Sequence, residues 1–163
     1  MGGLLAMRRL TSGSPASWMV VMTWVIELGY AKPPDGLSAN WRGHWATKAR
    51  STASVRALVK HFAIEAGIEP MQRCQVEVIW CVKDKRRRDA DNAAPFAKAI
   101  FDGLAADKGV SAHIVADDDP AHMVKLMPRI EYRPDTTPHF EVIVTDLTHR
   151  SDAVDQLTKE RLT

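Results

Sequence analysis

Residues 75–106 read QVEVIWCVKDKRRRDADNAAPFAKAIFDGLAA, in which a charged stretch separates two apolar ones. The first apolar stretch, residues 75–82, alternates at first and then becomes continuously apolar, which predicts a well-covered β-strand. From Asn92, a candidate N-cap, apolar side chains recur at helical spacing and predict a helix over residues 92–106. The charged stretch 83–91 therefore lies between a strand and a helix.

The rest of the chain predicts one more helix and three more strands. Residues 46–66 carry apolar side chains at the i, i+3, i+4 spacing of an amphipathic helix. Strands are predicted over residues 18–28, 122–132 and 139–147, and the turn at 133–138 is expected to join the last two as an antiparallel hairpin. The predicted helix has a basic outer face formed by Lys48, Arg50, Arg56 and Lys60.

These elements predict one small domain of the α/β (α+β) class over residues 18–147, with a mixed sheet of about four strands and two main helices. Residues 1–17 are Gly- and Ser-rich and are expected to form a flexible N-terminal arm, and residues 148–163 a polar C-terminal tail. At 163 residues, 45% hydrophobic and 26% charged, the composition is typical of a globular protein. The net charge of +2 does not by itself indicate nucleic-acid binding.

The two cysteines are too few for a disulfide framework, and no Cys-x-x-Cys or Cys/His cluster in the sequence suggests zinc. Cys74 and Cys81 are seven residues apart, so on one strand they would point to opposite faces. A reduced, cytoplasmic setting fits this usage. The apolar run 18–28 carries Glu27 and is too short to cross a bilayer, so a strand is preferred over a secretory signal and no membrane association is expected.

The charged stretch places five basic side chains before an Asp-x-Asp pair. If residues 89–91 are extended, Asp89 and Asp91 point to the same side and can share a Mg²⁺ ion, whose shell is completed by water and substrate phosphate. The alternative is a solvated loop whose charges cancel, which is the commoner outcome for such runs. The basic side chains expected to bind DNA phosphates are Lys85, Arg86, Arg87 and Arg88.

A second acidic run, Asp117-Asp118-Asp119, precedes Pro120, and alone it predicts only a turn. Together with the Asp-x-Asp pair it could complete a metal site for phosphodiester hydrolysis, in which the ion activates water and arginines hold the backbone. Lys98 falls on the same helix face as Asp91, two turns along, where it could reach a phosphate, although a plain surface lysine is the simpler interpretation.

The order of these residues resembles the RusA family of Holliday-junction resolvases. That family shows a basic run, Asp-x-Asp-Asn, a helix with a lysine and an apolar/Asp/small/Leu stretch, and an Asp-Asp turn before the last strands. Over residues 18–147 this chain is similar, with RRRDADN at 86–92, KAIFDGL at 98–104 and DDD at 117–119. The family's upstream Pro-Pro turn and polar segment are matched by Pro33-Pro34, Ser38, Asn40, Arg42 and His44.

The resemblance implies a homodimer that binds a four-way DNA junction and nicks two opposed strands with Mg²⁺, for which Mn²⁺ is expected to substitute. It implies that Asp89 and Asp91 are metal ligands and that a later aspartate completes the site. Asp119 is the first choice for that aspartate and Asp118 the second. Lys98 would be the catalytic lysine.

Two features depart from the family pattern. The gap between Asp91 and Lys98 is about one helical turn longer than usual, and three consecutive aspartates offer two registers for the third carboxylate, with Asp117 as the extra residue.

The residues of the upstream segment that are expected to bind DNA are Asn40, Arg42 and His44.

The main alternative is a DNA-binding module without chemistry, in which basic side chains hold phosphates independently of sequence. Such a module gains nothing from Asp89 and Asp91 beside its phosphate contacts, because the carboxylates repel DNA unless a metal intervenes. A metabolic enzyme of small phosphates is disfavoured because no Gly-rich phosphate loop is present. Trp41 and Trp45 could stack on unpaired bases, but burial in the core is the preferred expectation.

Overall fold

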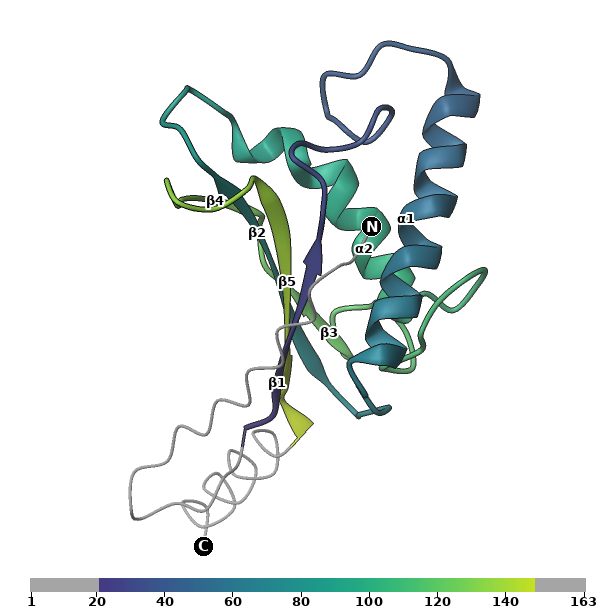
Figure 1. Cartoon of the computed structure of the whole chain (residues 1–163). Coiled ribbons are helices and arrows are strands. Elements are labelled where there is room, and N and C mark those ends of the chain that lie inside the picture. Colours follow the sequence, from purple (N-terminus) through teal and green to yellow (C-terminus); the bar gives the residue numbers. More distant parts are fainter. Residues whose placement is uncertain (1–20, 149–163) are drawn as a thin grey trace, which may run out of the picture.

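The computed structural model describes residues 21–148, in which two helices cover one face of a mixed β-sheet (Figure 1). The expected α/β (α+β) class is confirmed, with five strands instead of about four. The predicted N-terminal arm, all but the first residue of the predicted C-terminal tail and the start of the first predicted strand lie outside the described residues. The strands are β1 (Thr23–Leu28), β2 (Cys74–Val82), β3 (Met123–Lys125), β4 (Arg129–Tyr132) and β5 (His139–Asp146), and the helical elements are α1 (Trp45–Glu65), the short 3₁₀ helix η1 (Ala90–Ala93) and α2 (Ala94–Ala105).

β2 is the central strand, because every other strand except β1 pairs with it. β5 runs antiparallel between β1 and β2, with Phe140 opposite Leu28 on one side and opposite Trp80 on the other. β3 and β4 pair in parallel with successive parts of the other edge of β2. The predicted antiparallel hairpin is therefore wrong, since β4 and β5 follow one another in sequence but lie on opposite sides of β2.

The single strand predicted over residues 122–132 is divided into β3 and β4. Pro128 stands immediately before β4 and has no backbone N–H to donate, so the ladder along β2 is interrupted there. Pairing resumes with Arg129 opposite Ile79. The helix predicted at 46–66 and the strands at 75–82 and 139–147 are confirmed to within one residue at each end.

Aromatic rings occupy the centre of the core between the helices and the sheet. Phe140 stacks on Trp80 with ring centroids 5.4 Å apart, and it meets Phe96 of α2 edge to face at 4.8 Å. Phe96 and Phe140 are fully buried, and removing such a side chain from water stabilises a fold by about 1.5–3 kcal/mol. α2 packs closely on α1 because Gly103 has no side chain where a Cβ would come within 3.0 Å of the Arg56 backbone.

The basic outer face predicted for α1 is only partly observed. Lys48 and Arg50 are exposed, but the Arg56 guanidinium donates hydrogen bonds to the backbone carbonyls of Lys108 and Val110. Arg56 therefore fastens the loop after α2 to α1 instead of presenting its charge to a ligand. Among the described residues, no helix is both long enough and apolar enough to cross a membrane.

The expected burial of Trp45 is wrong, since its side chain is 75% exposed. Trp45 is the first residue of α1, and the buried positions of that helix begin only at Val55, so its first turns lie beyond the core. Trp41 is half-buried, and its indole lies directly over Gly43, where a Cβ would meet the ring.

Cys74 and Cys81 project from opposite faces of β2, as predicted, and both are buried free thiols. Cys74 belongs to the core beneath the helices, whereas Cys81 lies on the other face of the sheet. The strand alternation alone accounts for this separation.

Candidate nucleic-acid and metal-binding site

The charged loop of residues 83–89 extends from the end of β2 and leads into η1 (Figure 1). Arg88 folds back onto the protein, donating a 2.8 Å hydrogen bond to Asp84 and lying 5.8 Å over the ring of Trp80. The hydrogen bond from Arg88, followed by one from the backbone of Arg86, lowers the pKa of Asp84 to about 2. Arg88 thus braces the loop. Among the residues of this loop that are predicted to bind DNA, three are exposed, namely Lys85, Arg86 and Arg87.

Asp89 and Asp91 are both exposed directly after this loop. Asp89 is extended, but residues 90–93 form η1, so the strand-like alternation expected over 89–91 is not observed. The Asp89 carboxylate instead caps η1 by accepting a 3.1 Å hydrogen bond from the N–H of Asp91. The predicted N-cap Asn92 is therefore wrong, because Asn92 lies inside η1, which Asp89 caps, and α2 begins after Ala93 without a side-chain cap. The two carboxylates share one turn instead of one side of a strand.

The polar segment of residues 38–44 contacts the same turn. The side-chain amide of Asn40 donates a 2.8 Å hydrogen bond to the side-chain oxygen of Asn92. The backbone N–H of Ala39 donates to the backbone carbonyl of Asn92 at 3.1 Å. Two further residues of this segment that are expected to bind DNA are exposed, namely Arg42 and His44.

Lys98 belongs to a charged group that joins α2 to the turn before β3. Lys98 donates a 3.1 Å hydrogen bond to Asp102, and Lys125 donates one of 2.7 Å to Asp118. The hydrogen bond from Lys125 lowers the pKa of Asp118 against the opposing effect of burial, and the charge of Lys98 and a hydrogen bond with Asp102 lower it further. We call these four residues the Lys98–Asp118 group.

Asp119, the first choice for the third carboxylate, closes the turn instead. Its Oδ1 accepts hydrogen bonds from the backbone N–H groups of Ala121 and His122, at 2.9 and 3.0 Å, and lies 2.8 Å from the His122 ring Nδ1. The contact with the His122 ring is the main cause that lowers the pKa of Asp119. Asp117 caps the N–H of Asp118 at 2.7 Å. Asp118 is the aspartate of this run whose carboxylate meets α2.

The four predicted metal-ligating carboxylates do not converge in one three-ligand group. Within residues 21–148, three ligand atoms from His, Cys, Asp or Glu lie within 4.8 Å of one another only in the group Cys81, His139 and Glu141. Asp91 and Lys98 are seven residues apart, roughly 10 Å along a helix that rises about 1.5 Å per residue. Because Mg²⁺ needs only one or two protein carboxylates when water and phosphate complete its shell, the Asp89–Asp91 pair is the part of the predicted site that fits this ion.

No protein-family model matches the chain, and no curated protein matches it.

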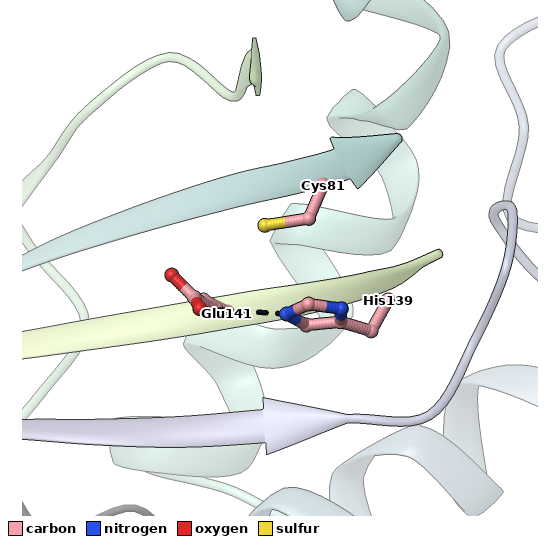
Figure 2. Close-up of side chains that lie close together, drawn as sticks. All are labelled: Cys81, His139 and Glu141. Carbon is pink, nitrogen blue, oxygen red and sulfur yellow. Dashed lines mark hydrogen bonds and ion pairs between the residues drawn. The ribbon is translucent and has the colours of Figure 1, made fainter. Parts of the chain in front are cut away.

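A further group of titratable side chains lies on the sheet face away from the helices (Figure 2). Cys81 of β2 stands opposite His139 of β5, and Glu141 follows two residues along on the same face. His139 Nε2 and Glu141 Oε1 are 3.4 Å apart, and their side chains are 9% and 18% exposed. Sequence reasoning missed this group because the cysteine is distant in sequence, and the only available signal was the His-x-Glu spacing at the start of a predicted strand.

Proposed function

We propose that this protein is a Mg²⁺-dependent endodeoxyribonuclease that acts on branched DNA such as four-way junctions. The observation that carries the proposal is that η1 and α2 contact two other predicted parts of the site, the polar segment 38–44 and the acidic turn 117–119. Asn92 binds Asn40 at the start of this helical unit, and Lys98 and Asp102 lie beside Asp118 further along it. Three segments that are distant in sequence thus meet along one element.

In this proposal, Asp89 and Asp91 would hold Mg²⁺, with Mn²⁺ as a substitute, because exposed carboxylate oxygens are the donors that these ions prefer. When bound, the ion supplies an activated water and neutralises charge on the scissile phosphate. Asp89 also caps η1, which keeps its carboxylate at the end of the basic loop.

The basic side chains near this pair would draw in and orient the DNA backbone. Arg86 and Arg87 are exposed and can therefore contact phosphates. Guanidinium groups form bidentate hydrogen bonds with phosphate oxygens. Lys98 is held by Asp102 on α2, so its ammonium group is positioned to stabilise negative charge on a phosphate placed along this helix. Asp118, whose carboxylate faces α2, would act beside Lys98 and not as a third ligand of the ion held by Asp89 and Asp91.

Two opposed nicks in a four-way junction need two active sites, so the proposal includes a homodimer with one site in each subunit. The exposed Trp45 at the start of α1 is available to stack on an unpaired base near the branch point. Such stacking would favour branched DNA over an intact duplex, in which the bases are already stacked.

A second candidate is a module that binds branched or single-stranded DNA without cutting it. The observation that favours it is that Asp118 and Asp119 are engaged by Lys125 and His122, so these two carboxylates already have cationic or hydrogen-bonding partners. The two candidates share the basic loop and differ in what Asp89 and Asp91 do.

The deciding experiment incubates the purified protein with labelled four-way, forked and linear duplex DNA, with and without Mg²⁺. We expect cleavage of the branched substrates only with the ion, and we expect Asp91→Asn to retain binding but lose cleavage. Asp107→Asn, which changes an exposed aspartate in the loop after α2, is the matched control and should cut normally. Cleavage by Asp91→Asn at the wild-type rate would show that the site is misassigned, and tight binding without any cleavage by the wild type would favour the second candidate.

A further inference from the structure

The group on the sheet face away from the helices is built by two adjacent strands. Cys81 on β2 and His139 on β5 are directly opposite one another in the antiparallel register, and Glu141 lies on the same face of β5. Figure 2 shows the three side chains directed toward a common point between the strands. The sulfur, an imidazole nitrogen and a carboxylate oxygen all lie within 4.8 Å of one another.

The histidine is held in the tautomer that a metal ligand requires. His139 Nδ1 lies 2.7 Å from the backbone carbonyl of Thr137, an acceptor, so Nδ1 carries the hydrogen and donates it. In the neutral ring, Nε2 then has a free lone pair on the side of Cys81 and Glu141. Hydrogen bonding of the remote ring nitrogen to a carbonyl is the usual way in which proteins orient a ligating histidine.

The spacing of the two β5 ligands matches a tetrahedral ion. His139 Nε2 and Glu141 Oε1 are 3.4 Å apart. Two ligands that each lie about 2.0–2.1 Å from a zinc ion at the tetrahedral angle are roughly 3.3–3.4 Å from one another. The pair therefore needs little movement to bind one ion.

The charges around the sulfur also favour a cation. Glu131 of β4 stands opposite Cys81, and Glu27 of β1 stands opposite Glu141, so both acidic residues lie on the same face of the sheet as the sulfur. Carboxylates contributed by β1, β4 and β5 thus surround a buried thiol.

We propose that Cys81, His139 and Glu141 form a binding site for a single Zn²⁺ ion. Cys81 Sγ, His139 Nε2 and a Glu141 carboxylate oxygen are three protein ligands, and water or an added ligand takes the fourth position. Binding transfers the Cys81 thiol proton to solvent and replaces the S–H bond by a thiolate–zinc bond. A thiolate ligand selects zinc over Mg²⁺, so this site is chemically distinct from the Asp89–Asp91 pair.

Arg133 completes the site from the turn between β4 and β5. Its Nη1 and Nη2 donate to the two carboxylate oxygens of Glu141 at 2.6 and 3.1 Å, which fixes the orientation of that ligand. An ion at this site joins the end of β2 to the beginning of β5, so the proposal also implies that the metal-loaded protein resists unfolding better than the metal-free protein.

Cobalt titration of the reduced, metal-free full chain tests the proposal, because Co²⁺ replaces zinc and gives a thiolate-to-cobalt charge-transfer band only when sulfur binds it. Cys74→Ala and Cys81→Ala are a matched pair, since each removes one of the two buried thiols of β2. We expect one equivalent of Co²⁺ to produce the band in the wild type and in Cys74→Ala, where Cys81 is the only thiol, and no band in Cys81→Ala. Zn²⁺ should then displace the cobalt and abolish the band.

Zinc affinity, measured by competition with a chromophoric chelator, should fall at least tenfold in His139→Gln. This second variant keeps both thiols, so it decides the question if either cysteine variant fails to fold. The proposal is overturned if the wild type gives no charge-transfer band, or if Cys81→Ala and His139→Gln both bind zinc as tightly as the wild type.

Discussion

The side-chain amide of Asn40 donates a 2.8 Å hydrogen bond to the side-chain oxygen of Asn92. This contact joins the loop before α1 to η1, the turn that carries Asp89 and Asp91. The backbone hydrogen bond from Ala39 to Asn92 lies beside it. The relationship explains how a polar segment far upstream in the sequence reaches the acidic pair.

The Asn40–Asn92 contact is expected to serve the proposed site more than overall stability. Asn40→Ala removes an exposed hydrogen bond, so the free energy of unfolding should fall by only about 0.5–1.5 kcal/mol. Cleavage of four-way junctions should fall by a larger factor, because the upstream segment is no longer held against η1. Thermal unfolding and cleavage rates of Asn40→Ala, Asn92→Ala and the double variant form a cycle, and additive losses of cleavage would show that the two side chains act independently.

Neighbouring arginines of the basic loop are expected to have different roles. Arg87 is exposed, so Arg87→Ala should weaken DNA binding and reduce the slope of log affinity against log salt by about one. Arg88 is bound to Asp84 and lies over Trp80, so Arg88→Ala should lower the free energy of unfolding by about 1 kcal/mol. Binding isotherms at several salt concentrations, together with urea unfolding, separate the two effects. A salt slope unchanged in Arg87→Ala would indicate that this side chain does not contact phosphate.

The exposed indole of Trp45 is expected to contribute to binding but not to folding. Stacking on an unpaired base contributes about 1–3 kcal/mol, so Trp45→Ala should weaken binding of a four-way junction by roughly 5- to 140-fold. Its melting temperature should stay close to that of the wild type, because the side chain is 75% exposed. Ile64→Ala is the matched control, since Ile64 is 63% exposed near the opposite end of the same helix and should leave binding unchanged. Equal losses of affinity in both variants would argue against stacking.

The carboxylate of Glu141 is expected to make stability depend on pH. Burial would raise the pKa of Glu141, but hydrogen bonds from Arg133 outweigh this effect and hold the folded pKa below its ordinary value of 4.5. Because the folded pKa is the lower one, the stabilisation is present above about pH 4.5 and is lost as the pH falls through the folded pKa. Glu141→Gln should therefore lower the free energy of unfolding by about 1–3 kcal/mol near pH 7, with a smaller difference from the wild type in more acidic buffer.

Urea unfolding of both proteins across pH 3–7 measures this difference, with a chelator present to exclude metal effects. A constant difference between wild type and Glu141→Gln over the whole range would show that the carboxylate charge has no part in it.

The residues by themselves determined most of the secondary structure. The spacing of apolar side chains located α1 and α2 to within a few residues, because a helix that covers a sheet must bury one stripe. The alternation of β2 also placed Cys74 and Cys81 on opposite faces. The exposure of Lys85, Arg86 and Arg87 follows equally from local chemistry, because charged side chains in a loop are costly to bury.

Tertiary structure decided which residues meet, and for this the pattern along the chain holds little information. Strand alternation gives the face of a side chain but not its partner strand, so the parallel pairing of β4 with β2 was not predicted. The same limit concealed the Cys81–His139 register. The choice of Asp118 over Asp119 to face α2 depended on the turn, since hydrogen bonds with Ala121 and His122 take the Asp119 carboxylate. Such pairings depend on the packing of the whole sheet and its helices, because each contact is stable only after the elements that carry it have come together.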